Sequence, residues 1–367
     1  MVNTGLYIHV PFCIKKCPYC DFYSAAGCSE SEYGQYTSAV IRNIQNYLEK
    51  YPEIVFDTVY FGGGTPSVMP VSFFRDVLES LKHNLDDGAE ITAELNPGTA
   101  GEEKLAGIRQ SGVNRLSLGI QSAVDSELRD LGRIHNFREA ETAVSLARKA
   151  GFSNISGDLM TGIKGQTEET LMKSVNALAD LELDHISSYM LKIEQGTEYF
   201  RNGISSEVPD EEKTAELYLL SVKTLADRGY HQYEISNFSR PGYESRHNLK
   251  YWHCDDYIGI GPSAHSCFGG KRYEVPRDLS KFIKEKNQQE IINEDHPCGF
   301  FEKAMLALRL TEGIDLNNYP EEAPSVLKQA EKLAGTGLVK CRNGVVSLTA
   351  EGFLLSNEII SRLLADF

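Results

Sequence analysis

Short apolar runs alternate with longer stretches of helical periodicity over the first two thirds of the chain. Runs rich in β-branched and aromatic residues, the expected strands, lie at 6–10, 58–61, 90–95, 115–120, 154–160 and 185–193. The stretches at 32–50, 71–84, 137–150, 168–181 and 210–227 repeat apolar residues every three or four positions, which is typical of amphipathic helices. This alternation predicts an α/β fold, with a parallel sheet covered by helices. Six strand–helix units indicate an incomplete (β/α)6 barrel or a strongly curved open sheet.

Polar and reactive residues follow the ends of these strands. They occupy residues 11–20, 62–66, 94–97 and 121–122, and Asp158 stands near the end of a fifth strand. In parallel α/β folds the ligand site lies at the carboxyl ends of the strands. We therefore expect these five segments to meet at one site.

The alternation stops after Ser236. Residues 237–297 are rich in Gly, Tyr, His and Asn, and we expect an irregular connecting region that folds back over the barrel mouth. Residues 298–367 predict two helices, a hairpin about Asn343-Gly344 and a last helix, an order that resembles a winged helix. This division predicts a partial barrel over 1–236, the connecting region over 237–297 and a small winged-helix-like domain over 298–367.

Charge and hydropathy exclude several classes of function. The net charge of −15 over 367 residues argues against a general nucleic-acid binder, because phosphate binding needs a positive surface. The winged-helix-like segment itself holds seven Lys and Arg against nine Asp and Glu, so we expect a structural or protein-docking module. No apolar stretch is long enough for a transmembrane helix, and the first residues resemble no targeting signal, so we expect a cytoplasmic protein.

Three of the eight cysteines, Cys13, Cys17 and Cys20, lie within eight residues, directly after the first strand. A disulfide scaffold is typical of short secreted chains, so clustered cysteines here indicate a metal centre. Three thiolates can hold three irons of a cubane cluster and leave the fourth iron open. A zinc site is the alternative, but structural zinc prefers four protein ligands, and no fourth cysteine follows at short spacing.

The segment Cys13-Ile14-Lys15-Lys16-Cys17-Pro18-Tyr19-Cys20 resembles the cluster motif of the radical S-adenosylmethionine (SAM) superfamily. The resemblance covers nearly the whole chain. It implies a radical SAM barrel that carries an oxygen-sensitive 4Fe–4S cluster on Cys13, Cys17 and Cys20. It also implies that SAM binds the open iron through its amino and carboxylate groups, with Tyr19 against the adenine.

Other segments match the same superfamily. Gly62-Gly63-Gly64-Thr65-Pro66 resembles its GGGTP segment, which implies that Gly63, Gly64 and Thr65 bind the methionine amino group. Further matches imply contacts with the ribose and methionine parts of SAM, or packing beside the ligand and cluster, for Tyr7, Glu94, Gln121, Arg133 and Asp158. Taken singly, each of these residues also fits an ordinary turn, strand end or solvated charge.

Within the superfamily the chain is similar to the group that holds oxygen-independent coproporphyrinogen III oxidases and the HemW heme chaperones. The oxidase resemblance would require a further cysteine two residues after Cys20, where this chain has Phe22, and a long extension before the first strand. The segment His247-Asn248-Leu249-Lys250-Tyr251-Trp252 matches the HNxxYW heme-binding motif of the chaperones.

Histidine is a common ligand of heme iron, and Tyr251 and Trp252 offer flat faces for a porphyrin. The alternative is a loop histidine with two aromatic side chains packed on the barrel rim, and His253 and Cys254 are alternative iron ligands. The resemblance implies a heme chaperone, without an assigned catalytic residue, that takes heme from a donor protein, delivers it to respiratory heme proteins and forms a homodimer. A radical enzyme that oxidatively decarboxylates coproporphyrinogen III is the alternative function.

Overall fold

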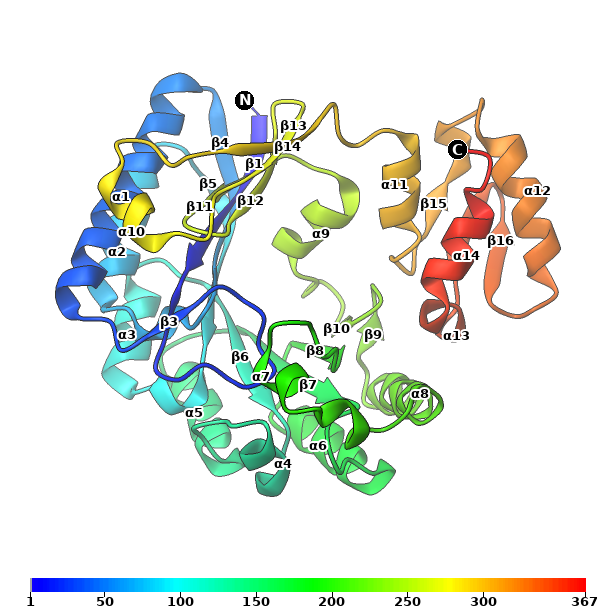
Figure 1. Cartoon of the computed structure of the whole chain (residues 1–367), viewed down its shortest axis with the longest axis horizontal. Helices are drawn as coiled ribbons and strands as arrows, with labels where there is room; N and C mark the ends of the chain where they lie inside the picture. Colours follow the sequence, from blue (N-terminus) through cyan, green and yellow to red (C-terminus); the bar gives the residue numbers. More distant parts are fainter. Residues whose placement is uncertain (1) are drawn as a thin grey trace.

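A computed structural model describes residues 2–367, and a twelve-stranded sheet forms its centre (Figure 1). The strand order is β14-β13-β12-β11-β1-β4-β5-β6-β7-β8-β10-β9, so the sheet curves without closing. Its six parallel barrel strands are β1 (Val2–Val10), β4 (Ile54–Gly63), β5 (Leu85–Leu95), β6 (Arg115–Gln121), β7 (Asn154–Thr161) and β8 (His185–Met190). The predicted incomplete barrel of six parallel strands is confirmed.

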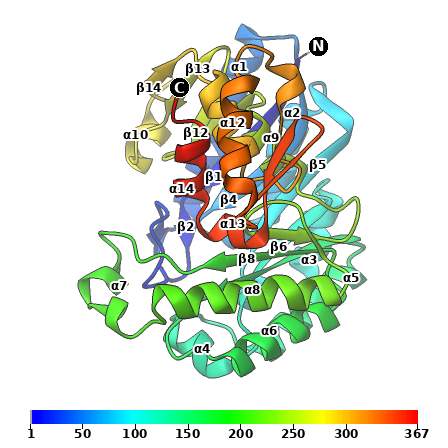
Figure 2. The ribbon, with the colours of Figure 1, turned by 90° about the vertical axis from the view of Figure 1, so that its right-hand side faces the viewer.

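Helices cover the outer face of this sheet, as Figures 1 and 2 show. They are α1 (Glu30–Lys50), α2 (Val71–Leu81), α3 (Glu102–Gln110), α4 (Asp125–Asp130), α5 (Phe137–Lys149), α6 (Glu168–Asp180) and α8 (Glu211–Asp227). Local sequence sets where three of them begin. Ser29, Asn136 and Thr167 each cap a helix, and the third helical residue bonds back to the cap, which pairs backbone groups that would otherwise lack partners.

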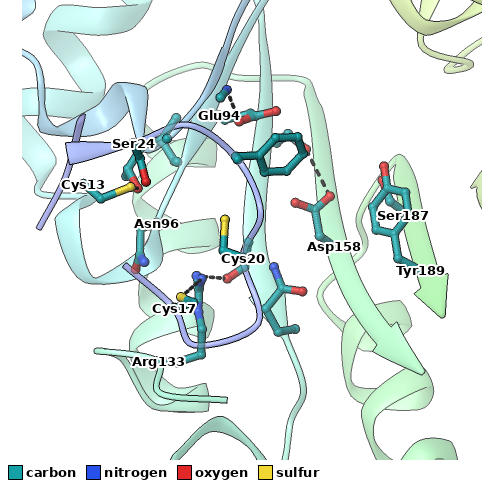
Figure 3. A pocket seen from close by; sticks show the side chains of 18 of the residues that line it. Cys13, Cys17, Cys20, Ser24, Glu94, Asn96, Arg133, Asp158, Ser187 and Tyr189 are labelled. Carbon is teal, nitrogen blue, oxygen red and sulfur yellow. Dashed lines mark hydrogen bonds between the residues drawn. The ribbon is translucent and has the colours of Figure 1, made fainter. Parts of the chain in front are cut away.

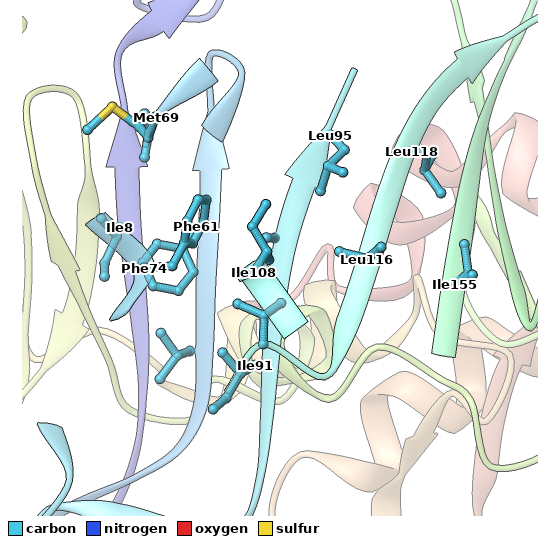
Figure 4. Packing of buried hydrophobic residues seen from close by; sticks show 14 of the residues in the cluster. Ile8, Phe61, Met69, Phe74, Ile91, Leu95, Ile108, Leu116, Leu118 and Ile155 are labelled. Carbon is cyan, nitrogen blue, oxygen red and sulfur yellow. The ribbon is translucent and has the colours of Figure 1, made fainter. Parts of the chain in front are cut away.

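Successive side chains along each strand point alternately to the apolar core and to the barrel interior. On β6, Leu116 and Leu118 are buried among the residues of the main core, whereas Ser117 and Gly119 line an interior cavity. The same period of two applies to the neighbouring strands, because successive side chains point to opposite faces of a sheet. Figure 4 shows part of the resulting apolar layer, including Ile8, Phe61, Phe74, Ile91, Leu95, Ile108 and Ile155.

The segment 237–297 differs from the irregular region that we expected. It contains β10 (Asn237–Ser239), α9 (Arg246–His253), β11 (Tyr257–Ile260), β12 (His265–Phe268), β13 (Lys271–Glu274), α10 (Leu279–Lys284) and β14 (Ile291–Asp295). β11 pairs in parallel with β1, and β12 to β14 extend the sheet by antiparallel pairing. β10 pairs with β8 and with β9 (His231–Gln232). Both edges of the barrel are thus covered, which satisfies backbone groups that an open edge would expose.

The C-terminal segment forms a small unit with its own core (Figure 1). Its elements are α11 (Phe300–Ala307), β15 (Ile314–Asp315), α12 (Ala323–Ala334), β16 (Val339–Arg342), β17 (Val345–Leu348), α13 (Ala350–Leu354) and α14 (Ser356–Leu363). The expected hairpin is present: Asn343 and Gly344 have φ values of 54° and 82°, which suit a two-residue turn between β16 and β17. None of the helices formed by residues 2–367 has the length and apolar character of a membrane span.

Candidate functional site

The three clustered cysteines line one cavity of about 350 Å³ inside the barrel (Figure 3). Cys13 ends the short strand β2 (Phe12–Cys13), which pairs with β3 (Ala25–Ala26), and Cys17 and Cys20 lie in the loop between them. The backbone N–H of Cys20 donates to the carbonyl of Cys17 at 3.1 Å, so the loop is tightly turned. All three side chains are partly exposed. The loop therefore presents its thiols to the cavity.

Two polar side chains contact these sulfurs. Arg133 donates from Nη1 to Cys17 Sγ at 3.5 Å, and Thr65 donates from Oγ1 to Cys13 Sγ at 3.5 Å. The guanidinium places a positive charge beside the Cys17 sulfur. In the part of the chain that the structure describes, residues 2–367, these three sulfurs do not all lie within 4.8 Å of one another. Three thiols on one loop can each bind a separate iron of a cubane cluster.

The glycine segment after β4 forms a second wall of the cavity. Gly63, Gly64 and Thr65 line it, and the N–H of Gly63 donates to Glu94 Oε2 at 3.1 Å. Close packing supplies a reason for glycine at two of these positions. A Cβ at Gly64 would lie 2.7 Å from the carbonyl oxygen of Phe12, and one at Gly63, where φ is +107°, would lie 2.6 Å from the His9 ring. These glycines therefore let β4 pack against the chain that leads into the cysteine loop.

Two carboxyl groups face the cavity from neighbouring parts of the sheet (Figure 3). Glu94 on β5 accepts from the hydroxyl of Tyr60 at 2.9 Å, and Asp158 on β7 accepts from Ser117 at 3.2 Å. Withdrawal from bulk solvent, with the nearby Asp158 second, raises the pKa of Glu94 to about 7. The same withdrawal raises the pKa of Asp158 to about 6, although bonds from Ser187 and Ser117 oppose it. A cationic ligand would favour the ionised form of both.

Arg133 supplies positive charge on the opposite side of the cavity. Its Nη2 donates to the carbonyl of Gly119 at 2.7 Å, and its buried Nε has no partner. A buried N–H without an acceptor is costly, so this atom fits an anionic ligand group. Gln121 ends β6 with a φ of 73°, a left-handed conformation that is uncommon outside glycine and frequent at ligand sites. Tyr19, within the cysteine loop, lines the cavity and packs edge-on against Tyr199.

The cavity brings together most of the residues that the sequence singled out. Its lining includes Cys13, Cys17, Tyr19, Cys20, Gly63, Gly64, Thr65, Glu94, Gln121, Arg133 and Asp158. Tyr7 is not among the lining residues: its hydroxyl is bonded to His9 Nδ1 at 3.0 Å, and its ring packs near that of Tyr60. The donor set, the unpartnered Arg133 Nε and the two acidic groups fit a cluster on three thiols and a charged ligand beside it.

Sequence reasoning missed several cavity residues that lie before the carboxyl ends of the strands. Tyr60, Arg115, Ser117 and Tyr189 line the cavity, and Asn248 reaches it from α9. Period-two alternation carried the necessary signal, since Arg115, Ser117, Gly119 and Gln121 occupy every second position of β6. Arg115 is 2% exposed, and its Nε has no partner.

The HNxxYW segment is helical, and its histidine is buried. His247 is 0% exposed on α9; its Nδ1 lies 2.8 Å from Thr58 Oγ1 and its Nε2 lies 2.8 Å from the Tyr251 hydroxyl. Its ring stacks on Tyr60, which separates it from the cavity. Burial, with the charge of Lys250 second, lowers the pKa of His247 to about 3. The imidazole is therefore neutral, but in this arrangement both nitrogens are engaged and neither is free to bind iron.

Backbone and ion-pair contacts hold this helix on the barrel. Glu90 accepts from the N–H groups of Arg246 and His247, both at 3.1 Å, and Lys250 pairs with Asp57 at 2.9 Å. Access to His247 would thus require part of α9 to move away from β4 and β5. His253, at the end of the same helix, is exposed, and its Nε2 lies 3.0 Å from Glu312.

Comparison with known proteins gives two family matches. Residues 7–178 match the radical SAM superfamily, and residues 300–355 match the HemN C-terminal domain. The structure resembles coproporphyrinogen III oxidase (HemN) from Escherichia coli, with a TM-score of 0.86 over 100% of this chain and 91% of that chain. Their sequence identity is 21%, so this likeness establishes the fold alone.

Several similar sequences are named heme chaperone HemW. The heme chaperone HemW of Bacillus subtilis (strain 168) is 33% identical over 98% of this chain and 99% of its own. The heme chaperone HemW of Escherichia coli (strain K12) is 31% identical over 99% of this chain and 98% of its own. Radical SAM membership implies a 4Fe–4S cluster and SAM. The chain belongs to the HemW family of the radical SAM superfamily.

Proposed function

We propose that this protein is a heme chaperone, which binds heme together with a 4Fe–4S cluster and SAM and delivers the heme to respiratory heme proteins. The observation that carries the choice is Phe22, which lines the cavity where the oxidase resemblance would require a further cysteine. Its side chain is 64% exposed, so the mouth of the cavity presents an apolar surface beside the cysteine loop. The heme chaperone relatives support the same choice.

In this proposal Cys13, Cys17 and Cys20 hold the cluster. When bound, such a cluster supplies an electron to the SAM sulfonium. Arg133 pairs with the SAM carboxylate, and Glu94 and Asp158 hold its positively charged and hydroxyl groups, because these side chains converge on the cavity with opposite charges. Tyr19 and Gln121 complete the ligand contacts beside the glycine segment.

Heme ligation through His247 requires a change in the contacts of its imidazole. The hydroxyl of Tyr251 occupies Nε2, so iron can bind there only after this contact opens. His253 offers an exposed imidazole six residues further along the chain. We propose that His247 is the ligand and that Tyr251 limits its access.

Heme titration of anaerobically reconstituted protein tests this proposal. Wild type should show a Soret band shifted from that of free heme, and His247→Ala should weaken or alter that band while the cluster absorption persists. Tyr251→Phe should bind heme faster, because Nε2 loses its hydroxyl partner. His83→Ala, an exposed histidine after α2, is the matched control and should behave as wild type.

Two results would change the proposal. Loss of the Soret shift in His253→Ala, with His247→Ala unaffected, would move the ligand to the exposed end of α9. Formation of protoporphyrinogen from coproporphyrinogen III, with SAM consumed and a heme spectrum indifferent to His247→Ala, would replace the chaperone by the oxidase. Size-exclusion chromatography with and without heme tests the proposed homodimer.

A further inference from the structure

Three cysteines outside the cluster loop converge on a second place in the fold. Cys254 caps the end of α9, Cys267 lies on β12, and Cys298 precedes α11. Ligand atoms of Cys254, Cys298 and Glu302 all lie within 4.8 Å of one another. Cys267 Sγ lies 3.6 Å from Cys298 Sγ. Cys254 and Cys298, 44 positions apart in the chain, thus come together with Glu302. Cys267 lies beside Cys298, although it is outside the group of three.

The spacing suits a shared metal ion. Zinc binds thiolates at about 2.3 Å in a tetrahedral arrangement, so two sulfurs on one ion stand about 3.8 Å apart. The observed 3.6 Å between Cys267 and Cys298 is close to that separation. It is far longer than a sulfur–sulfur bond of about 2.05 Å. A disulfide would also join only two of the three cysteines and leave the third thiol beside it.

Backbone geometry and charge around the cluster point the same way. Cys298 has a φ of 68°, and such a left-handed non-glycine residue is uncommon outside sites where the surroundings require it. Glu302 accepts from the N–H of Cys298 at 2.7 Å and pairs with Arg272. The Arg272 Nη2 lies 4.0 Å from Cys267 Sγ. One positive charge is therefore in place to offset the excess negative charge of a thiolate-rich metal site.

We propose that Cys254, Cys298 and Glu302, with Cys267 as the fourth ligand, bind one zinc ion. The ion would join α9 and β12 of the sheet to α11, the first helix of the C-terminal unit. Because α9 also carries the HNxxYW segment, the metal would fix the end of the helix whose other end buries His247. This site is separate from the cysteine loop and does not depend on the function proposed above.

Zinc content and zinc ligands test the proposal on anaerobic protein that retains its 4Fe–4S cluster. After incubation with one equivalent of zinc chloride and desalting, mass spectrometry of the elements should find one zinc per chain. Zinc-edge X-ray absorption should show sulfur at about 2.3 Å and oxygen at about 2.0–2.2 Å. The double variant Cys254→Ser/Cys298→Ser should retain at least tenfold less zinc, with unchanged iron.

A matched double variant controls for the loss of any two thiols. Cys28→Ser/Cys341→Ser removes two cysteines that lie outside both groups, and it should retain zinc as wild type does. Absence of zinc from wild type would overturn the proposal, as would equal retention by Cys254→Ser/Cys298→Ser. A Cys267–Cys298 disulfide in the anaerobic protein would overturn it as well. The wild-type zinc and absorption measurements decide the matter even where a variant fails to fold.

Discussion

At the scale of single residues, the protonation of Glu94 and Asp158 affects both the stability of the fold and the binding of a ligand. The pKa values of both carboxyl groups lie above their usual values, mainly because the cavity withdraws them from solvent. Between about pH 4 and pH 7 the folded protein therefore binds more protons than the unfolded chain. Their contribution to the free energy of unfolding accordingly increases as the pH falls through this window. A cationic ligand requires the opposite, ionised state, so stability of the free protein and ligand affinity should change in opposite directions.

We expect the affinity for SAM to fall about tenfold between about pH 8 and pH 6, because protonation removes negative charge that faces the cationic ligand.

Asp158→Asn should weaken binding at pH 8, by about ten- to a hundredfold for a lost charged hydrogen bond, and flatten the pH dependence. It should also stabilise the ligand-free protein at pH 8, where the buried charge is most costly. Calorimetric titration and thermal unfolding measure these effects. Asp87→Asn, at an exposed position on β5, is the control; equal pH profiles in wild type and Asp158→Asn would contradict the assignment.

The cysteine loop yields a second prediction for single residues. Cys13→Ala, Cys17→Ala and Cys20→Ala should each prevent a stable 4Fe–4S cluster, because each removes one of the three thiols with which the described residues line the cavity. Cys341→Ser, at an exposed thiol on β16, should leave iron and sulfide at the wild-type level. Iron and sulfide assays with low-temperature electron paramagnetic resonance provide the measurement. A full cluster in Cys17→Ala would show that the loop does not hold it.

Close packing between elements explains the glycine segment. Gly64 lies where β4 passes the chain between β1 and β2, and its N–H donates to the carbonyl of Val10 at 2.8 Å. The next N–H, of Thr65, donates to Phe12 at 2.7 Å. These two bonds attach the glycine segment to the base of the cysteine loop. Disturbance of β4 at this point should therefore reach the cluster through backbone contacts.

Gly64→Ala tests this connection, because its Cβ would lie 2.7 Å from the Phe12 carbonyl and 2.9 Å from that of Val10. We expect lower thermal stability and reduced cluster content together, with weaker SAM binding as a consequence. Gly34→Ala is the matched control: nothing lies within 4 Å of its Cβ on α1, and a helical alanine should stabilise the protein by about 0.5–1 kcal/mol. Normal cluster content with selective loss of SAM affinity would instead favour direct crowding of the ligand.

At the scale of elements, the barrel strands were predictable because buried parallel strands leave continuous apolar runs. The expectation that polar residues at the carboxyl ends of the strands meet at one site also placed Glu94 and Gln121 correctly in one cavity. It missed Arg115, the first residue of β6, and Tyr60 on β4, because only the register of the sheet determines which face these polar side chains take. The strands β11 to β14 were missed because they are short and because β11 pairs with β1, which is far away in the sequence. The strands β12 to β14 then extend the sheet from β11.

At the scale of the whole molecule, residues 2–367 form two large and separate apolar cores. The main core lies between the sheet and its helices, and the second lies within the C-terminal unit. Their junction includes backbone bonds, such as the N–H of Ile235 to Arg309 at 3.1 Å and that of Thr311 to Tyr233 at 3.0 Å. Separate cores predict that damage to one unit leaves the ligand site of the other in place.

Two identical substitutions test this separation. Leu178 on α6 and Leu363 on α14 are both 0% exposed, the first in the main core and the second in the C-terminal core. Each change to alanine should cost about 2–5 kcal/mol through lost burial and a residual cavity. Leu363→Ala should raise hydrogen exchange within residues 300–367 and leave cluster content and SAM affinity near wild type. Leu178→Ala should raise exchange in the barrel and reduce both. If Leu363→Ala released the cluster as Leu178→Ala does, the two cores would have to unfold as one cooperative unit.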